Sequence, residues 1–289
     1  MLWHFLRLLA VRFRQTASVI QEKLEKLCDA LHRSAALLKK GRGRIDTPMQ
    51  ERCQRDADGL PVSLAEPEVL KVVSEDGTPV QAWVMRPPGV DGPVPCLLNV
   101  HGGPKSQYGN TFHDEFQVYA GAGYAVVYGN PRGSDGQTEA FAAAVLGAWG
   151  DKDWQDVTAI ANAIGCLGYV DQQRLGIMGG SYGGFMTSWA VGHTSRFKAA
   201  CSERAVNNLH SMVGTSDIGS WFIVQHAGKA PHQDLGAYLA MSPIAYAGNI
   251  ETPLLILHSE NDLRCPIEQG EQLYVALKLR NRPVEFWRF

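Results

Sequence analysis

The sequence predicts an α/β fold with a mostly parallel sheet and helices on both of its faces. Five short, continuously apolar segments between residues 96 and 257 have the composition of buried parallel strands. Segments with helical periodicity separate them, and strands that alternate with helices imply right-handed crossover connections. The 289 residues are enough for one such domain of roughly 200–250 residues and an extension.

The composition excludes several classes of protein. The sequence is 45% hydrophobic and 19% charged, with 30 glycines, which is typical of an α/β globule. Its net charge of −2 gives no reason to expect a nucleic acid partner. The six cysteines show no C-x-x-C spacing, so we predict a reducing, cytoplasmic location. The sequence contains no metal-ligand cluster and no phosphate-binding loop, and we therefore expect no cofactor.

Residues 1–65 are predicted to form a basic helical extension and a linker. Apolar residues recur at helical spacing up to residue 38, and residues 1–60 contain 12 Lys and Arg against 7 Asp and Glu. Three interpretations remain open: a helix packed on the domain, a helix on an anionic membrane surface, and an arginine-rich targeting segment. Arg7 interrupts the first apolar run, which is too short to span a bilayer.

The compact domain is predicted to cover residues 66–289 and to begin with an antiparallel hairpin. Residues 68–74 and 79–86 alternate apolar and polar side chains around a turn. The later strands are predicted at residues 96–100, 124–128, 175–178, 199–201, 254–257 and 284–289. The helices are predicted at residues 139–146 in part, 151–167, 185–191 and 267–279. The periodicity is lost between residues 203 and 248, which suggests an insertion over the functional site.

Residues 175–191 have the pattern of a nucleophile elbow, in which a strand turns sharply into a helix. The serine at the turn, Ser181, is the candidate nucleophile. Its backbone must be strained to expose the hydroxyl, and the strand and helix then approach so closely that side chains at Gly179 and Gly183 would collide. The first N–H groups of the helix point at the site, where they can stabilise an oxyanion.

Two further segments supply other groups that acyl transfer needs. His101-Gly-Gly-Pro104 follows a buried strand, and its glycine N–H groups can form an oxyanion hole together with the N–H of Tyr182. Asp262 follows another buried strand and is placed to orient an imidazole, with Glu260 as the competing acid. Together with Ser181, these groups predict an acyl-transfer site.

The base of this site is not evident in the sequence. The last histidine is His258, which lies too close to Asp262 along the same strand end to be oriented by it easily. His226 and His232 lie in the insertion and are candidates for a replacement base. Without a base the hydroxyl of Ser181 is a weak nucleophile, and loss of a triad histidine costs several orders of magnitude in rate.

Four motifs closely resemble the catalytic domain of the prolyl oligopeptidase family, and within it the acylaminoacyl-peptidase-like branch. They are H-G-G-P at residues 101–104, N-P-R-G-S at 130–134, G-G-S-Y-G-G-F at 179–185 and H-S-E-N-D at 258–262. The resemblance covers residues 66–289 and implies an α/β-hydrolase fold. It also implies a serine peptidase that cleaves short peptides or blocked N-terminal residues, although some relatives act as esterases.

The same resemblance implies roles for particular residues of this chain. They are the nucleophile Ser181, the acid Asp262, the oxyanion donors Gly103 and Tyr182, and the substrate-site arginines Arg132 and Arg204.

The sequence departs from the family in two places. Members carry a β-propeller ahead of the hydrolase domain, and residues 1–65 are too short and too helical to form one. Members also carry the triad histidine and a helix after the last strand. Because both are absent, we expect a C-terminally truncated domain without its terminal helix. We hypothesise that a helix at residues 19–40 covers the sheet face that this leaves exposed.

Three functions remain open. The first is a serine peptidase acting by acyl transfer on short or N-acylated peptides, nearly inactive as this chain because the base is missing. The second is a pseudoenzyme or peptide-binding module that has kept the pocket. The third is a small-ester carboxylesterase that uses His226 or His232 as its base. In each case the expected partner is a short peptide or a small acyl compound.

Overall fold

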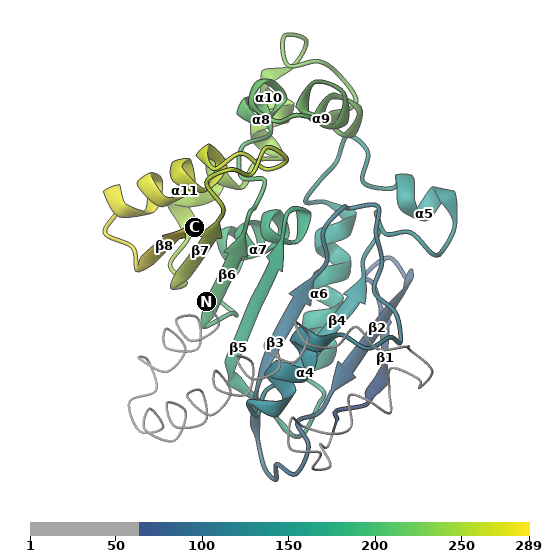
Figure 1. The fold of residues 1–289 in the computed structure, drawn as a ribbon. Coiled ribbons are helices and arrows are strands. Elements are labelled where there is room, and N and C mark those ends of the chain that lie inside the picture. The colour runs from purple at the N-terminus through teal and green to yellow at the C-terminus, as the bar shows by residue number, and fades with distance from the viewer. Residues whose placement is uncertain (1–63) are drawn as a thin grey trace, which may run out of the picture.

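The computed structural model describes residues 64–289, which form one eight-stranded sheet with the strand order β1-β2-β4-β3-β5-β6-β7-β8 (Figure 1). The extension, the helix at residues 19–40 and its proposed packing lie outside the described residues. The predicted α/β fold with a mostly parallel sheet is confirmed, since every neighbouring pair from β4 to β8 is parallel.

The predicted hairpin opens the sheet. β1 (Pro67–Val73) pairs antiparallel with β2 (Pro79–Met85), and β2 pairs antiparallel with β4 (Ala125–Asn130). The turn between β1 and β2 contains Gly77, whose φ of 84° favours glycine. The remaining strands are β3 (Val94–Val100), β5 (Val170–Gly180), β6 (Ala199–Glu203), β7 (Leu254–His258) and β8 (Val284–Arg288). All the strands predicted from the sequence are therefore present.

Two apolar clusters lie on opposite faces of the sheet, because successive side chains of a strand point to opposite sides. One cluster contains Leu98 and Val127 and is covered by α6 (Lys152–Ile164), α7 (Tyr182–His193) and α11 (Glu268–Leu279). The other contains Leu97 and Val126 and is packed against α4 (Asp114–Gly121). The prediction of helices on both faces is confirmed, although the sequence did not indicate α4.

The segment between β6 and β7 is helical, which the sequence periodicity did not indicate. It forms α8 (Leu209–Thr215), α9 (Gly219–Ala227), α10 (Leu235–Ala240) and a 3-10 helix, η1 (Pro243–Asn249). Figure 1 shows α8, α9 and α10 grouped at the top of the view, above α7. A further short helix, α5 (Glu139–Ala143), lies between β4 and α6 and corresponds to the partial helix predicted there.

The register of the central strands positions the site. Val100 at the end of β3 pairs with Gly179 of β5, and Gly179 pairs with Ser202 of β6. The chain segments that follow these three strands therefore leave the sheet side by side at its carboxyl edge. In open α/β sheets this edge is where ligands bind.

Candidate active site

Ser181 lies at a sharp turn between β5 and α7, as predicted. Its φ of 60° and ψ of −119° are rare for a residue with a side chain. The turn is held by two backbone hydrogen bonds. The Ser181 N–H donates to the Glu203 carbonyl at 3.0 Å, and the Phe185 N–H donates to the Ser181 carbonyl at 2.9 Å. The observed backbone is that of a nucleophile elbow.

The glycines around Ser181 are required by one carbonyl group of β3. A Cβ at Gly183 would lie 2.0 Å from the Val100 carbonyl oxygen, and a Cβ at Gly179 would lie 2.3 Å from the same atom. The Gly179 Cβ would also meet Gly183 carbonyl atoms at 2.9 Å. The predicted collision between strand and helix is therefore confirmed, and the structure adds β3 as the principal obstacle.

The H-G-G-P segment lies directly against the nucleophile. A Cβ at Gly102 would lie 3.4 Å from the Ser181 Cβ and 3.9 Å from its Oγ. Gly103 has a φ of 122°, which favours glycine. Tyr182 is the first residue of α7, and the first N–H groups of a helix have no intrahelical acceptor. That the N–H groups of Gly103 and Tyr182 act as oxyanion donors stays a prediction.

The His101 imidazole holds this segment to a second loop. His101 is buried, and its Nε2 lies 2.8 Å from Ser134 Oγ while its Nδ1 lies 2.6 Å from the Gly102 carbonyl oxygen. Burial lowers the pKa of this imidazole. The side chain therefore anchors the segment that contacts Ser181.

Asp262 organises the loop after β7. Its Oδ1 accepts the N–H groups of Arg264 and Cys265, both at 2.9 Å. This loop places the Cys265 Sγ 3.7 Å from Ser181 Oγ, and the buried His258 hydrogen-bonds through Nε2 to the Cys265 carbonyl oxygen at 2.6 Å. Asp262 is thus on the loop that touches the nucleophile, and its role as the acid stays a prediction.

Glu260 is engaged away from the nucleophile. Its carboxylate forms a 3.0 Å ion pair with Arg288 of β8, and its side chain is 56% exposed. This geometry favours Asp262 over Glu260 as the acid.

A base beside Ser181 is not found among residues 64–289, where no histidine is hydrogen-bonded to Oγ. The neighbour of Oγ is the thiol of Cys265, and burial raises its pKa to about 11, so the thiol is neutral near pH 7. His226 accepts a hydrogen bond from Trp149 Nε1 at 3.2 Å, and burial lowers its pKa to about 4. His232 is exposed after α9.

A pocket of about 250 Å³ opens beside the elbow, next to Gly102 and Gly180. Arg204 lines it with a side chain that is 56% exposed and a guanidinium that lies over Gly180. Glu203 also lines the pocket, and burial, followed by the charge of Glu115, raises the pKa of its carboxyl group. Arg204 therefore lines the pocket beside the elbow, and its role in substrate binding stays a prediction. The sequence did not indicate Glu203 and Glu115 as pocket residues, because only the fold brings these two side chains close together.

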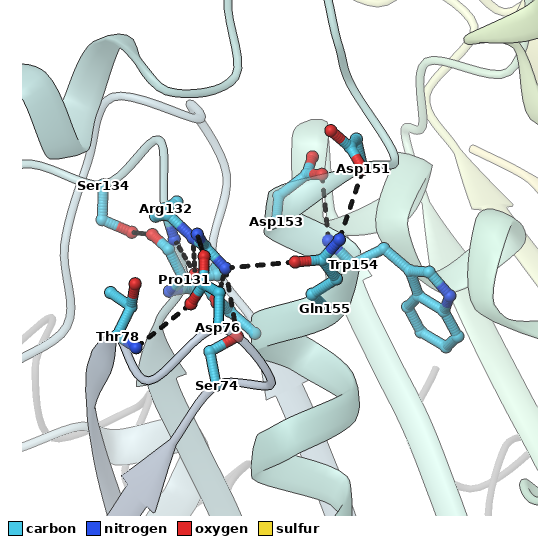
Figure 2. A network of polar contacts seen from close by, with 11 residues as sticks. Ser74, Asp76, Thr78, Pro131, Arg132, Ser134, Asp151, Asp153, Trp154 and Gln155 are labelled. Carbon is cyan, nitrogen blue, oxygen red and sulfur yellow. Dashed lines mark hydrogen bonds and ion pairs between the residues drawn. The ribbon is translucent and has the colours of Figure 1, made fainter.

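Arg132 lies outside this pocket and is 5% exposed. Its guanidinium donates to Asp156 at 2.7 and 2.9 Å, to Ser74 Oγ at 3.0 Å, and to Asp76 (Figure 2). The sequence predicted a substrate-binding role for Arg132, but in the structure its guanidinium N–H groups donate to acceptors of the protein itself. We propose a structural role for Arg132 instead.

The side chain of Tyr182 points into the protein interior. It is 1% exposed, and its hydroxyl donates to the carboxylate of Asp153, which is itself fully buried. Asp153 also accepts the N–H groups of Gly150 and Trp154, each at 2.9 Å. Burial raises the pKa of Asp153 to about 6, and the hydrogen bond from Tyr182 opposes that rise. Sequence reasoning did not indicate Asp153, since it lies 29 residues from its partner.

A strained serine between strand and helix, a glycine loop against it and an acid-bearing loop beside it are the features of the α/β-hydrolase fold. The chain belongs to the prolyl oligopeptidase family, whose family model matches residues 110–289. A second family model, acetyl xylan esterase, matches residues 61–149.

Curated relatives agree with this assignment. The chain is 48% identical over 230 residues to the uncharacterized peptidase YuxL of Bacillus subtilis, covering 78% of this chain and 35% of the relative. It is 35% identical over 193 residues to the acylamino-acid-releasing enzyme of Arabidopsis thaliana, covering 64% of this chain and 25% of the relative. The chain thus spans about a third or less of the length of these relatives.

Solved structures show the same fold. The acylaminoacyl peptidase of Pyrococcus horikoshii superposes with a TM-score of 0.76 at 36% identity, covering 79% of this chain and 37% of that one. A puromycin-hydrolyzing peptidase of Mycobacterium tuberculosis superposes with a TM-score of 0.75 at 31% identity, covering 81% and 36%. None of the helices within residues 64–289 has the length and apolar character needed to cross a membrane.

Proposed function

We propose that this chain is the hydrolase domain of a serine peptidase that cleaves short or N-acylated peptides through Ser181. The observation that carries the proposal is the strained elbow, with Gly102 placed so that an added Cβ would lie 3.4 Å from the Ser181 Cβ. Relatives named acylamino-acid-releasing enzymes support the substrate class. A related acylaminoacyl peptidase has also been solved in complex with Z-Gly-Gly-Phe-chloromethyl ketone.

The proposed reaction is acyl transfer. Ser181 Oγ bonds to the carbonyl carbon while its proton passes to a base, and the oxyanion receives the N–H groups of Gly103 and Tyr182. The C–N bond then breaks, the amine leaves with the proton, and water hydrolyses the acyl-enzyme. Asp262 orients the base, and Arg204 contacts the substrate in the adjoining pocket.

We propose that the base comes from outside residues 64–289, because none of the histidines there is hydrogen-bonded to Ser181 Oγ. If neither His4 nor His32 of the first 63 residues supplies this base, the 289-residue chain should hydrolyse substrates slowly. Added imidazole should accelerate hydrolysis of an N-acetylated aminoacyl p-nitroanilide, since it can take the proton that no side chain accepts. A rapid reaction that imidazole does not change would instead place the base within these 289 residues.

The nucleophile is tested by Ser181→Ala. We expect the imidazole-stimulated hydrolysis to fall to the level of buffer alone, whereas the exposed Ser195→Ala should retain it. Hydrolysis that persists in Ser181→Ala would refute the assignment. Peptide binding without any turnover, with or without imidazole, would instead favour the pseudoenzyme or binding module.

A small-ester carboxylesterase is the second candidate, favoured by the acetyl xylan esterase model that matches residues 61–149. In that case His226 or His232 serves as the base. Hydrolysis of p-nitrophenyl acetate without imidazole, lost in His226→Gln or His232→Gln, would establish it. The hydrogen bond between His226 and Trp149 argues against a free imidazole at that position.

A further inference from the structure

Two aspartates of α6 are hydrogen-bonded to two different segments, Asp153 to the elbow at Tyr182 and Asp156 to the loop after β4. Asp153 and Asp156 are both fully buried, and residues three apart in a helix lie on the same face. Burying two carboxylates is costly unless each is compensated by hydrogen bonds or an opposite charge. Asp153 is compensated by a hydrogen bond from the elbow, and Asp156 by hydrogen bonds and an ion pair from the loop after β4.

The first arm runs from Asp153 to the elbow. The Tyr182 hydroxyl donates to the Asp153 carboxylate, and the Tyr182 ring packs edge-on against Trp149 at 4.9 Å between centroids. These contacts fix the side chain of the residue whose backbone N–H we propose as an oxyanion donor. The position of that N–H is thereby tied to α6.

The second arm runs from Asp156 to the glycine loop. Asp156 accepts the backbone N–H of Arg132 at 2.7 Å as well as its guanidinium, which fixes the loop after β4. Two residues further on, the fully buried Ser134 meets His101 Nε2 at 2.8 Å. The next residue, Asp135, donates its N–H to the Ser106 carbonyl at 2.8 Å. The segment carrying Gly103 is thus held at both of its ends.

We propose that the α6 network, comprising Asp153, Tyr182, Asp156, Arg132, Ser134 and His101, sets the separation of the two oxyanion donors. Asp153, Asp156 and Ser134 are then positioning residues, since none of them contacts Ser181. That this separation matters for catalysis rests on the proposed function. The two oxyanion donors lie on separate segments, and their positions must be fixed by other contacts. A misplacement of about 1 Å can lower the rate roughly a hundredfold.

The network is tested by removing one hydroxyl from each arm in the full chain. Tyr182→Phe keeps the backbone N–H but loses the bond to Asp153, and Ser134→Ala loses the bond to His101. Tyr238→Phe is the matched control, because the hydroxyl of this buried side chain donates to the Lys229 carbonyl at 2.6 Å outside the network. The readouts are amide hydrogen exchange and the kcat and KM of imidazole-stimulated hydrolysis.

Exchange should report each arm separately. Tyr182→Phe should speed exchange of the Ser181 and Phe185 amides at least tenfold, and Ser134→Ala should do so for Ser106 and Asp135. Each variant should lower kcat at least tenfold with KM changed less than twofold, because an oxyanion donor acts on the transition state. The control should leave exchange and kcat unchanged.

Several outcomes would overturn the proposal. They are unchanged exchange in both variants, an unchanged kcat, or equally faster exchange at Thr194, at the far end of α7, which would show general loosening. Asp153→Asn, which keeps an acceptor for the Tyr182 hydroxyl, should leave exchange at Ser181 as slow as in the native chain, and tenfold faster exchange there would overturn the proposal. If hydrolysis does not depend on Ser181, the proposed function fails, and the exchange pattern alone decides whether the network holds the two loops.

Discussion

Ser181 keeps a backbone conformation that a residue with a side chain rarely adopts, and the glycines around it make that conformation possible. Gly183 has the least room, since its Cβ would lie 2.0 Å from the Val100 carbonyl oxygen. The obstacle is backbone of a central strand, which cannot move without disturbing the sheet. Side-chain size is therefore restricted at the elbow by β3 as well as by the turn itself.

We expect Gly183→Ala to lower the free energy of unfolding by about 3 kcal/mol, because the methyl group forces β3 and α7 apart. Urea denaturation with a circular dichroism readout measures this change. Gly168→Ala is the control, since Gly168 has open space around its Cβ position and should change stability little. Equal stability of the two variants would contradict the steric account.

Asp153 predicts a pH dependence of stability. Its pKa is raised to about 6 in the folded state, whereas an exposed aspartate titrates near 4. The folded protein therefore binds this proton more tightly than the unfolded chain. The stabilisation is complete below about pH 4 and is lost as the pH rises through 6.

Asp153→Asn removes this titration. We expect the stability of the variant relative to the native chain to rise by about 3 kcal/mol between pH 4 and pH 7. Buried His226, whose pKa is lowered to about 4, has the opposite effect, but it is present in both proteins and cancels. Urea denaturation at several pH values measures the difference. A difference that does not vary with pH would show that Asp153 has an ordinary pKa in the folded state.

At the scale of elements, the helices and strands that could be predicted from the sequence are those with long and clearly periodic apolar patterns. The buried strands and the helices α6, α7 and α11 were predicted because their apolar patterns are long enough to be distinct. Helix α4 and the helices between β6 and β7 were missed, and the α-helices among them have only six to nine residues. Helices this short depend on caps and tertiary packing more than on their own sequence pattern.

Helix α8 illustrates this dependence. The Asn208 side chain caps it by accepting the N–H groups of His210 at 3.1 Å and Ser211 at 3.3 Å. We expect Asn208→Ala to lower the free energy of unfolding by about 1 kcal/mol. Thermal unfolding measures this loss, with the exposed Asn110→Ala as the control. No loss in Asn208→Ala would mean that packing alone maintains α8.

At the scale of the whole molecule, the buried Arg132 joins three distant parts of the chain. It binds Asp76 in the first hairpin, 56 residues away, and Asp156 of α6, 24 residues away. Sequence motifs located Ser181, the glycine loop and Asp262, because each of these is a local pattern. The substrate-binding role of Arg132 stays a prediction, whereas its ion pairs could not be predicted, because only the fold brings these partners together.

We expect Arg132→Met to lower the free energy of unfolding by about 3–5 kcal/mol, since it leaves the buried charge of Asp156 uncompensated. Thermal and urea unfolding measure the loss. Arg174→Met is the control, because its ion pair with Asp171 is about one-third exposed and should contribute less than about 1 kcal/mol. A small effect of Arg132→Met with altered substrate affinity would support the substrate-binding role predicted from the sequence.

The register that aligns Val100, Gly179 and Ser202 has a consequence for engineering. The ends of these three strands are fixed by their pairing in the sheet. The helices between β6 and β7, by contrast, are joined to the sheet only where that segment begins and ends. Libraries of variants confined to residues 208–249 should therefore diversify ligand preference while the reactive serine keeps its place. The same alignment makes β3 a poor target for mutagenesis, because a shift of that strand would move every part of the site at once.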